Sequence, residues 1–204
     1  MNQPSPDPDV LREAIASGDA ARAMPALAGL RQVPAELAIP LLLLGLEQSP
    51  FMIRSLACAG LGVKRSEAGW LALADALGQD EDANVRAEAA NAIASYGVER
   101  AWPLLRAAFA ADGHWLVRCS ILSALAEQPE MPPPWLLDLA LQAITDDDGT
   151  VRVGGAEILG RLVREAIPAG AETPEAAEAR LALVALQADA DHRVVAVALN
   201  ALNP

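Results

Sequence analysis

The most constraining feature of the chain is a repeated pair, an apolar residue followed by arginine. The arginines of four similar segments are 32, 32 and 34 residues apart. The segments are SPFMIRSLACAGLG, DANVRAEAANAIASYG, GHWLVRCSILSALAE and DGTVRVGGAEILGRLV, with Arg54, Arg86, Arg118 and Arg152. Because this period is the length of two short helices and two tight turns, each repeat is predicted to be a helical hairpin.

The second helix of each hairpin has one apolar face. Counted from the arginine, positions −1, +3 and +7 lie on the same side of a helix. They hold Ile53, Val85, Val117 and Val151, then Ala57, Ala89, Ile121 and Gly155, then Leu61, Ile93, Leu125 and Leu159. This face is predicted to be core, with small residues at +3 where a neighbouring helix comes close. A fifth copy, DADHRVVAVALNAL, follows an insertion and has Val195 in place of the arginine.

The repeats predict an all-α solenoid of about five hairpins in a single domain covering residues 1–204. The hairpins occupy residues 34–202, a further helical pair residues 9–32, and a disordered tail residues 1–8. Aromatic residues make up only 3% of the chain, and the abundant alanine and leucine favour closely packed helices over a sheet. First helices are expected to start at Pro34, Ser66, Pro132 and Thr173, since Ser, Thr and Pro suit helix starts.

Aspartates accompany the arginines. An aspartate stands six residues before three of them, in the pairs Asp80 and Arg86, Asp112 and Arg118, and Asp146 and Arg152. The carboxylate is expected to accept the free amides at the start of the second helix, and the guanidinium to bond the aspartate of its own or the adjacent repeat. We predict a structural ladder of these pairs, weaker at the ends, where Gln48 and Val195 replace an aspartate and an arginine.

The turn aspartate, the Val–Arg pair, the small residue and the Leu–Gly pair resemble HEAT repeats, especially the phycobilisome-lyase HEAT-like subclass, over residues 34–202. This resemblance implies three functions: adaptors or chaperones of light-harvesting assemblies, subunits of bilin lyases, and a metal-dependent hydroxylase. The hydroxylase holds two irons with repeated His-Glu pairs, whereas the 2 histidines here, His114 and His192, are followed by Trp115 and Arg193. We therefore expect no metal site and no cofactor.

Charge narrows the choice of partner. The formal net charge is −12 and Lys64 is the only lysine, so a polyanion would be repelled over most of the surface. Nucleic acid is therefore not an expected partner, which also disfavours the DNA-glycosylase activity of some HEAT-like scaffolds. A protein partner with basic patches fits better.

The compartment follows from apolar segments and cysteines. The longest apolar run, residues 37–46, is about half a membrane span and contains Pro40, so membrane insertion is not expected. Cys58 and Cys119 lie in apolar helical segments and are interpreted as buried thiols. With no secretory signal near Met1, we expect a cytoplasmic protein.

Contact residues are predicted on the second helices, at positions +2, +5 and +9, away from the core face. These positions are often polar, and in HEAT arrays the second helices line the concave surface; the alternative is a merely solvated face. The predicted contacts are Glu88, Asn91, Ser95, Ser120, Ser123, Glu127, Glu157, Arg161 and Asn200, with Trp115 at a turn tip.

No phosphate loop, nucleophile elbow or Ser/His/Asp arrangement is present in the sequence. The leading interpretation is a non-catalytic protein-binding scaffold, an assembly or turnover factor of a larger complex such as a light-harvesting antenna. The alternative is an auxiliary subunit of a bilin lyase or isomerase.

Overall fold

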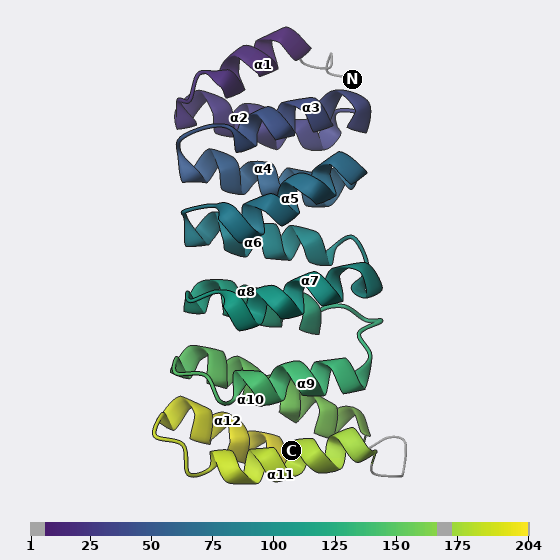
Figure 1. Ribbon diagram of the computed structural model, residues 1–204, viewed down its shortest axis with the longest axis vertical. Coiled ribbons are helices and arrows are strands. Elements are labelled where there is room, and N and C mark those ends of the chain that lie inside the picture. The colour runs from purple at the N-terminus through teal and green to yellow at the C-terminus, as the bar shows by residue number, and fades with distance from the viewer. Residues whose placement is uncertain (1–6, 167–172, 204) are drawn as a thin grey trace. The chain divides into compact units, whose positions relative to one another are not determined.

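The computed structural model describes residues 7–166 and 173–203. The described residues form twelve α-helices and one short 3-10 helix, with no strand among them (Figure 1). The elements are α1 (Pro8–Ala16), α2 (Ala20–Gly29), η1 (Leu30–Gln32), α3 (Ala35–Leu46), α4 (Phe51–Lys64), α5 (Glu67–Gln79), α6 (Ala83–Ala94), α7 (Val98–Ala111), α8 (Trp115–Ala126), α9 (Pro133–Ala143), α10 (Gly149–Ala166), α11 (Pro174–Leu186) and α12 (His192–Leu202). The predicted all-α fold of five hairpins and an N-terminal helical pair is confirmed.

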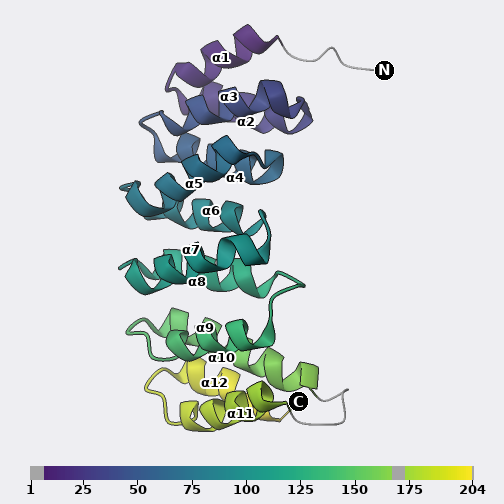
Figure 2. The ribbon, with the colours of Figure 1, turned by 45° about the vertical axis from the view of Figure 1, so that its right-hand side comes forward.

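The chain forms two compact units, Met1–Ser120 and Ile121–Pro204, and the division falls within α8. In the first unit the second helices α2, α4 and α6 pack against one another in order, and the first helices α1, α3, α5 and α7 do the same. In the second unit α10 packs against α12 and α9 against α11. Each unit is therefore a two-layered stack of hairpins (Figures 1 and 2).

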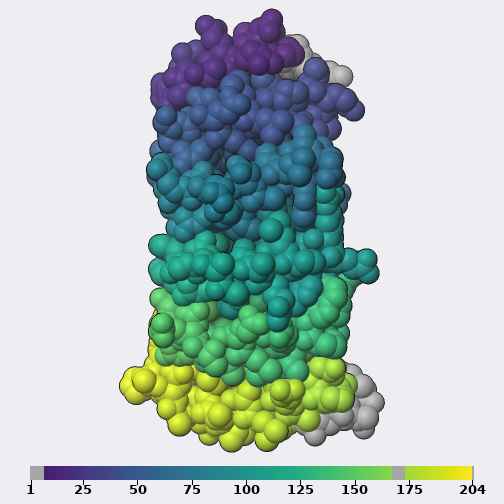
Figure 3. Space-filling model, viewed as in Figure 1, coloured from purple at the N-terminus to yellow at the C-terminus, as the bar shows by residue number. Residues whose placement is uncertain are grey.

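The core of each unit is built from the apolar face of the second helices. At position −1, Ile53, Val85, Val117, Val151 and Val194 are all 0% exposed, as predicted. Within each unit, the atoms of neighbouring hairpins meet along the face shown in the space-filling view (Figure 3). Small residues set the spacing: a Cβ added to Gly62 of α4 would lie 2.9 Å from the Cα of Ala92 in α6.

The helix starts follow local chemistry. Ser66 Oγ accepts a hydrogen bond from the Gly69 amide at 3.0 Å, and Thr173 Oγ1 accepts one from Ala176 at 3.2 Å. At the N-terminus, α1 begins at Pro8 and the Asp7 carboxylate accepts the Asp9 amide at 3.0 Å. Residues 7 and 8 of the predicted disordered tail, residues 1–8, therefore belong to the start of α1. Residues 1–6, and residues 167–172 of the predicted insertion, lie outside the described part.

Gly78 of α5 offers a test of this helical packing. A Cβ added there meets no atom within 4 Å, so Gly78→Ala is expected to stabilise the protein by up to about 0.5 kcal/mol through backbone entropy. Gly62→Ala should instead destabilise it, because its new methyl group meets the main chain of α6. Urea denaturation midpoints decide this: shifts of the same sign for both variants would contradict the close packing of α4 on α6.

Candidate functional site

Arginines of the second helices join successive turns through paired hydrogen bonds. The Nε and Nη2 atoms of Arg54 donate to Asp80 at 2.7 and 2.9 Å. Arg86 donates in the same way to Asp112 at 2.7 and 3.1 Å, and Arg152 to Asp189 at 2.9 and 3.0 Å. These side chains are between 9 and 18% exposed. In each case the aspartate belongs to the following turn, so the bond links one hairpin to the next.

Each arginine also bonds back to its own turn. The Nη1 atoms of Arg54, Arg86, Arg118 and Arg152 donate to the main-chain carbonyl six residues earlier, at 3.1, 3.0, 2.7 and 2.8 Å. Because this acceptor is a carbonyl, Gln48 serves Arg54 as well as an aspartate would. Arg54 therefore makes the same kinds of bonds as Arg86 and Arg152. The Gln48 side chain donates to the Leu44 carbonyl and supplies no carboxylate at the position of Asp80, so the weaker first copy stays a prediction. In the last copy Val195 supplies no guanidinium, but Asp189 still receives Arg152.

The second helix is capped by a different residue from the one predicted. Asp80 Oδ1 accepts the amide of Asp82 at 2.9 Å, and Asp82 Oδ1 then accepts the Asn84 amide at 2.8 Å. The ladder aspartate therefore shapes the turn, and the residue two positions later caps the helix. The same division of roles holds for Asp146 and Asp148, and for Asp189 and Asp191.

In the turn before α8 the cap is a histidine. The His114 amide donates to Asp112 Oδ1 at 2.8 Å, and His114 Nδ1 accepts the Leu116 amide at 3.2 Å. Trp115 is the first residue of α8 and is 42% exposed. His114 therefore has a structural role in the turn that presents the indole ring.

The ion pair of Arg86 with Asp112 predicts a pH dependence. Burial alone would raise the pKa of the Asp112 carboxyl, but hydrogen bonds from Arg86 and the His114 amide outweigh it and hold this pKa below its ordinary value. The depressed pKa contributes stability that is full above the unfolded-state pKa of about 4 and is lost as the pH falls through the lower folded-state pKa.

Asp112→Asn is accordingly expected to cost about 1 to 2 kcal/mol at pH 7, and its deficit relative to wild type should shrink below about pH 4. Urea midpoints at pH 7 and pH 3 measure both quantities. Asp75→Asn, which removes an exposed carboxylate of α5, controls for the loss of one negative charge. A deficit that stays constant down to pH 3 would contradict the role given to this ion pair.

The ten predicted contact residues differ in accessibility. Exposed side chains are Asn91, Trp115, Ser123, Glu127, Glu157 and Asn200; half-buried ones are Glu88, Ser95, Ser120 and Arg161. Ser95 Oγ donates to the Gly62 carbonyl at 2.8 Å, and Arg161 donates to the Ala126 carbonyl and to Glu165. These two side chains join adjacent second helices, so some of their hydrogen bonds hold the helices together rather than being free for a partner.

Four of the predicted residues meet around one pocket in the second unit. The pocket has a volume of about 300 Å³. It lies between the end of α8 and α10, and its polar lining is Ser123, Glu127, Glu157, Arg161 and Arg164. The offsets +5 and +9 therefore place carboxylates and guanidinium groups of neighbouring second helices on one accessible surface.

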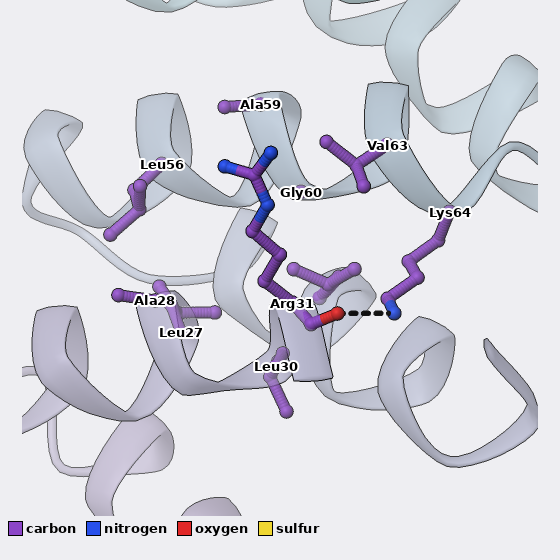
Figure 4. A pocket seen from close by; sticks show the side chains of 10 residues that line it. Leu27, Ala28, Leu30, Arg31, Leu56, Ala59, Gly60, Val63 and Lys64 are labelled. Atoms are coloured by element: carbon purple, nitrogen blue, oxygen red, sulfur yellow. Dashed lines mark hydrogen bonds between the residues drawn. The ribbon is translucent and has the colours of Figure 1, made fainter. Parts of the chain in front are cut away.

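An apolar pocket at the same offsets was missed by the sequence reasoning. Counted from Arg54, positions +2, +5 and +9 are Leu56, Ala59 and Val63, which line a pocket of about 220 Å³ between α2 and α4 (Figure 4). The offsets from Arg54 indicate this surface, but the predicted contact residues are polar and these three are apolar. A third pocket, of about 470 Å³, lies between the first helices α3 and α5, with Glu47, Asp75 and Gln79 in its lining.

Comparison with known proteins identifies the repeat. Residues 39–126 match the family model of HEAT repeats. Two solved structures are similar to the chain over nearly their whole length. The crystal structure of an engineered protein, Northeast Structural Genomics Consortium target OR329, has a TM-score of 0.54 and 18% identity, covering 100% of this chain and 96% of that chain. Human deoxyhypusine hydroxylase in complex with glycerol has a TM-score of 0.50 and 18% identity, covering 96% and 94%.

These structural likenesses establish the fold of stacked helical hairpins and nothing about activity. Among curated proteins no match to the chain is found. Within residues 7–166 and 173–203, no three His, Cys, Asp or Glu side chains group as a metal site requires. In the same residues no helix is both long and apolar enough to cross a membrane.

The two cysteines lie in different surroundings. Burial raises the pKa of the Cys58 thiol in α4 to about 12, which makes it an inert core thiol. Cys119 of α8 is half-buried rather than buried, which corrects the sequence interpretation.

Proposed function

We propose that this chain is a non-catalytic scaffold that binds another protein along the exposed face of its second helices. The observation that carries the proposal is the pocket between α8 and α10, where Ser123, Glu127, Glu157 and Arg161 line one accessible surface. HEAT repeats suggest a protein-interaction scaffold, because stacked hairpins present equivalent side chains in rows. Asn91 of α6, in the first unit, and Asn200 of α12, in the second, hold the same +5 offset in their own helices and are exposed.

The partner we propose is a protein segment with basic side chains. The pocket is lined by the exposed carboxylates of Glu127 and Glu157 and by the guanidinium groups of Arg161 and Arg164, of which that of Arg161 is already paired with Glu165 at 2.7 Å. The net charge of −12 would speed the approach of a basic partner and slow that of a nucleic acid. A reducing cytoplasmic setting suits the buried thiol of Cys58.

Charge reversal on the exposed face tests this function. Asn91, Ser123 and Glu157 are exposed, so replacing all three with arginine should preserve the helical circular dichroism spectrum and abolish capture of the partner. Capture is measured by affinity purification from the native cell and mass spectrometry. The control places three arginines on first helices, at Leu71, Gln79 and Glu178, which are also exposed. Capture lost only in the control would move the site to the first helices.

We further propose that the partner belongs to a light-harvesting antenna, and this proposal rests on the sequence resemblance alone. The second candidate, an auxiliary subunit of a bilin lyase or isomerase, has the same basis. Mixing the protein with a bilin and an apo-phycobiliprotein separates the two, because a lyase subunit should yield a covalent adduct or a spectral shift, alone or with a partner subunit. If neither appears, the lyase function is excluded and binding alone is left.

A further inference from the structure

A second surface with different chemistry lies at the N-terminal end of the first unit. We name it the α2–α4 groove, and Figure 4 shows it from close by. Its volume is about 220 Å³. Its lining is Leu27, Ala28, Leu30, Arg31, Leu42, Leu56, Ala59, Gly60, Val63 and Lys64. Eight of these ten residues are apolar or glycine, and none is acidic.

One glycine and one exposed valine shape the lining of the groove. A Cβ added to Gly60 would lie 2.3 Å from Leu42 Cδ2, so the absence of a side chain there lets α4 sit directly over Leu42. Val63 flanks the opening and is 55% exposed. An apolar side chain held this far in water at the rim of a groove can bury its surface against an incoming apolar side chain.

Two cations are among the lining residues of the groove. Lys64 Nζ donates to the carbonyls of Arg31 and Val33 at 2.9 and 2.7 Å, which uses two of its three hydrogens and anchors the ammonium beside η1. The Arg31 side chain is exposed and extends from η1 in the direction of Ala59 and Gly60 (Figure 4). In a chain with 27 acidic and 15 basic residues, a groove lined by two cations and no anion differs from the chain as a whole.

We infer that the α2–α4 groove binds an acidic segment of a partner protein. A large apolar side chain of that segment, such as leucine or phenylalanine, occupies the space beside Leu56 and Val63. A carboxylate next to it pairs with the exposed guanidinium of Arg31, and the ammonium of Lys64 adds a second positive charge to the lining. The apolar contact supplies affinity, and the two cations select an acidic segment over a basic one. This site goes beyond the proposed function, because its preferred charge is opposite to that of the pocket between α8 and α10.

Selection from a phage-displayed library of random 12-residue peptides on the full chain tests the inference. The selected peptides should contain a large apolar residue next to Asp or Glu. Their synthetic forms should bind Val63→Asp and Arg31→Glu at least about tenfold more weakly than wild type. The matched controls are Leu71→Asp, at an exposed leucine of α5, and Arg22→Glu, at an exposed arginine of α2 outside the groove. Both controls should bind as wild type does.

Three results would overturn the inference: a selection that yields no binder, one that yields only basic peptides, and acidic peptides that bind both groove variants as tightly as wild type. None of these results affects the proposed function. The variant with arginine in place of Asn91, Ser123 and Glu157 leaves the groove lining unchanged. Capture of a basic partner by this variant is therefore measured independently of peptide binding to the groove.

Discussion

Replacing Arg86 with alanine is expected to lower the free energy of unfolding by about 1 to 3 kcal/mol. The side chain makes two bonds to Asp112 and one each to the carbonyls of Asp80 and Glu81. Its removal leaves the Asp112 carboxylate, which is 9% exposed, without its charged partner. Urea denaturation followed by circular dichroism measures the change.

Two further variants show whether the geometry of the guanidinium matters. Arg86→Lys keeps the charge but cannot reproduce the paired bonds of the planar guanidinium, so it should fall between alanine and wild type. Arg22→Ala, at an exposed arginine of α2, should change stability by less than about 0.5 kcal/mol. If Arg86→Ala and Arg22→Ala unfold at the same urea concentration, the ladder does not stabilise the stack.

Gly155→Leu is expected to have an effect of similar or larger size, about 3 kcal/mol. A Cβ at Gly155 of α10 would lie 2.9 Å from both Ala143 Cβ and Ile144 Cγ2, and 3.0 Å from the Ala140 carbonyl oxygen. A leucine would therefore force α10 away from α9, because the nearest oxygen belongs to the main chain and cannot rotate aside. The adjacent Gly154 is the control, since a Cβ there meets only Leu122 Cδ1, at 3.1 Å.

Gly154→Ala should leave the thermal and urea midpoints nearly unchanged, while Gly155→Leu should lower both. If Gly155→Leu also kept the wild-type midpoints, the α9–α10 interface would accommodate the larger side chain easily. The small residue at position +3 would then have no part in setting the spacing of the hairpin.

The fold could be predicted because its signal is periodic. A valine or isoleucine at position −1 is fully buried in every copy, and the offsets of four residues that locate it are a property of any α-helix. The direction of the arginine bonds could not be predicted in the same way. Whether Arg86 reaches its own aspartate or that of the following turn depends on the distance between hairpins, which is set by packing.

The capping residue was assigned to the wrong aspartate for a chemical reason. Asp80 and Asp82 are the same residue type two positions apart, and either carboxylate can accept a main-chain amide. Only the helix start at Ala83 assigns Asp82 to the cap and leaves Asp80 for Arg54. The Asp-x-Asp spacing, repeated at Asp146 and Asp189, was the available clue.

The position of the candidate surface could be predicted from the sequence. Which of its side chains are bonded within the scaffold, and which part of it is apolar, could not. Periodicity placed Ser123 and Glu157 on the accessible side of the second helices, and the structure brings them to one pocket. Periodicity alone does not reveal that Ser95 is hydrogen-bonded to the Gly62 carbonyl of the neighbouring helix. A prediction based on polar residues does not find the groove at Leu56 and Val63, because the residues at the same offsets are apolar there.

The most direct test of the central proposal is cysteine footprinting of the second unit. Glu157→Cys places a thiol on the exposed face of α10, and Glu178→Cys places one on the exposed side of the first helix α11. Each variant is labelled with a maleimide, with and without the partner recovered by affinity purification. The proposed function predicts that the partner slows labelling at position 157 by about tenfold or more and leaves position 178 unchanged. Protection at position 178 with none at position 157 would contradict it.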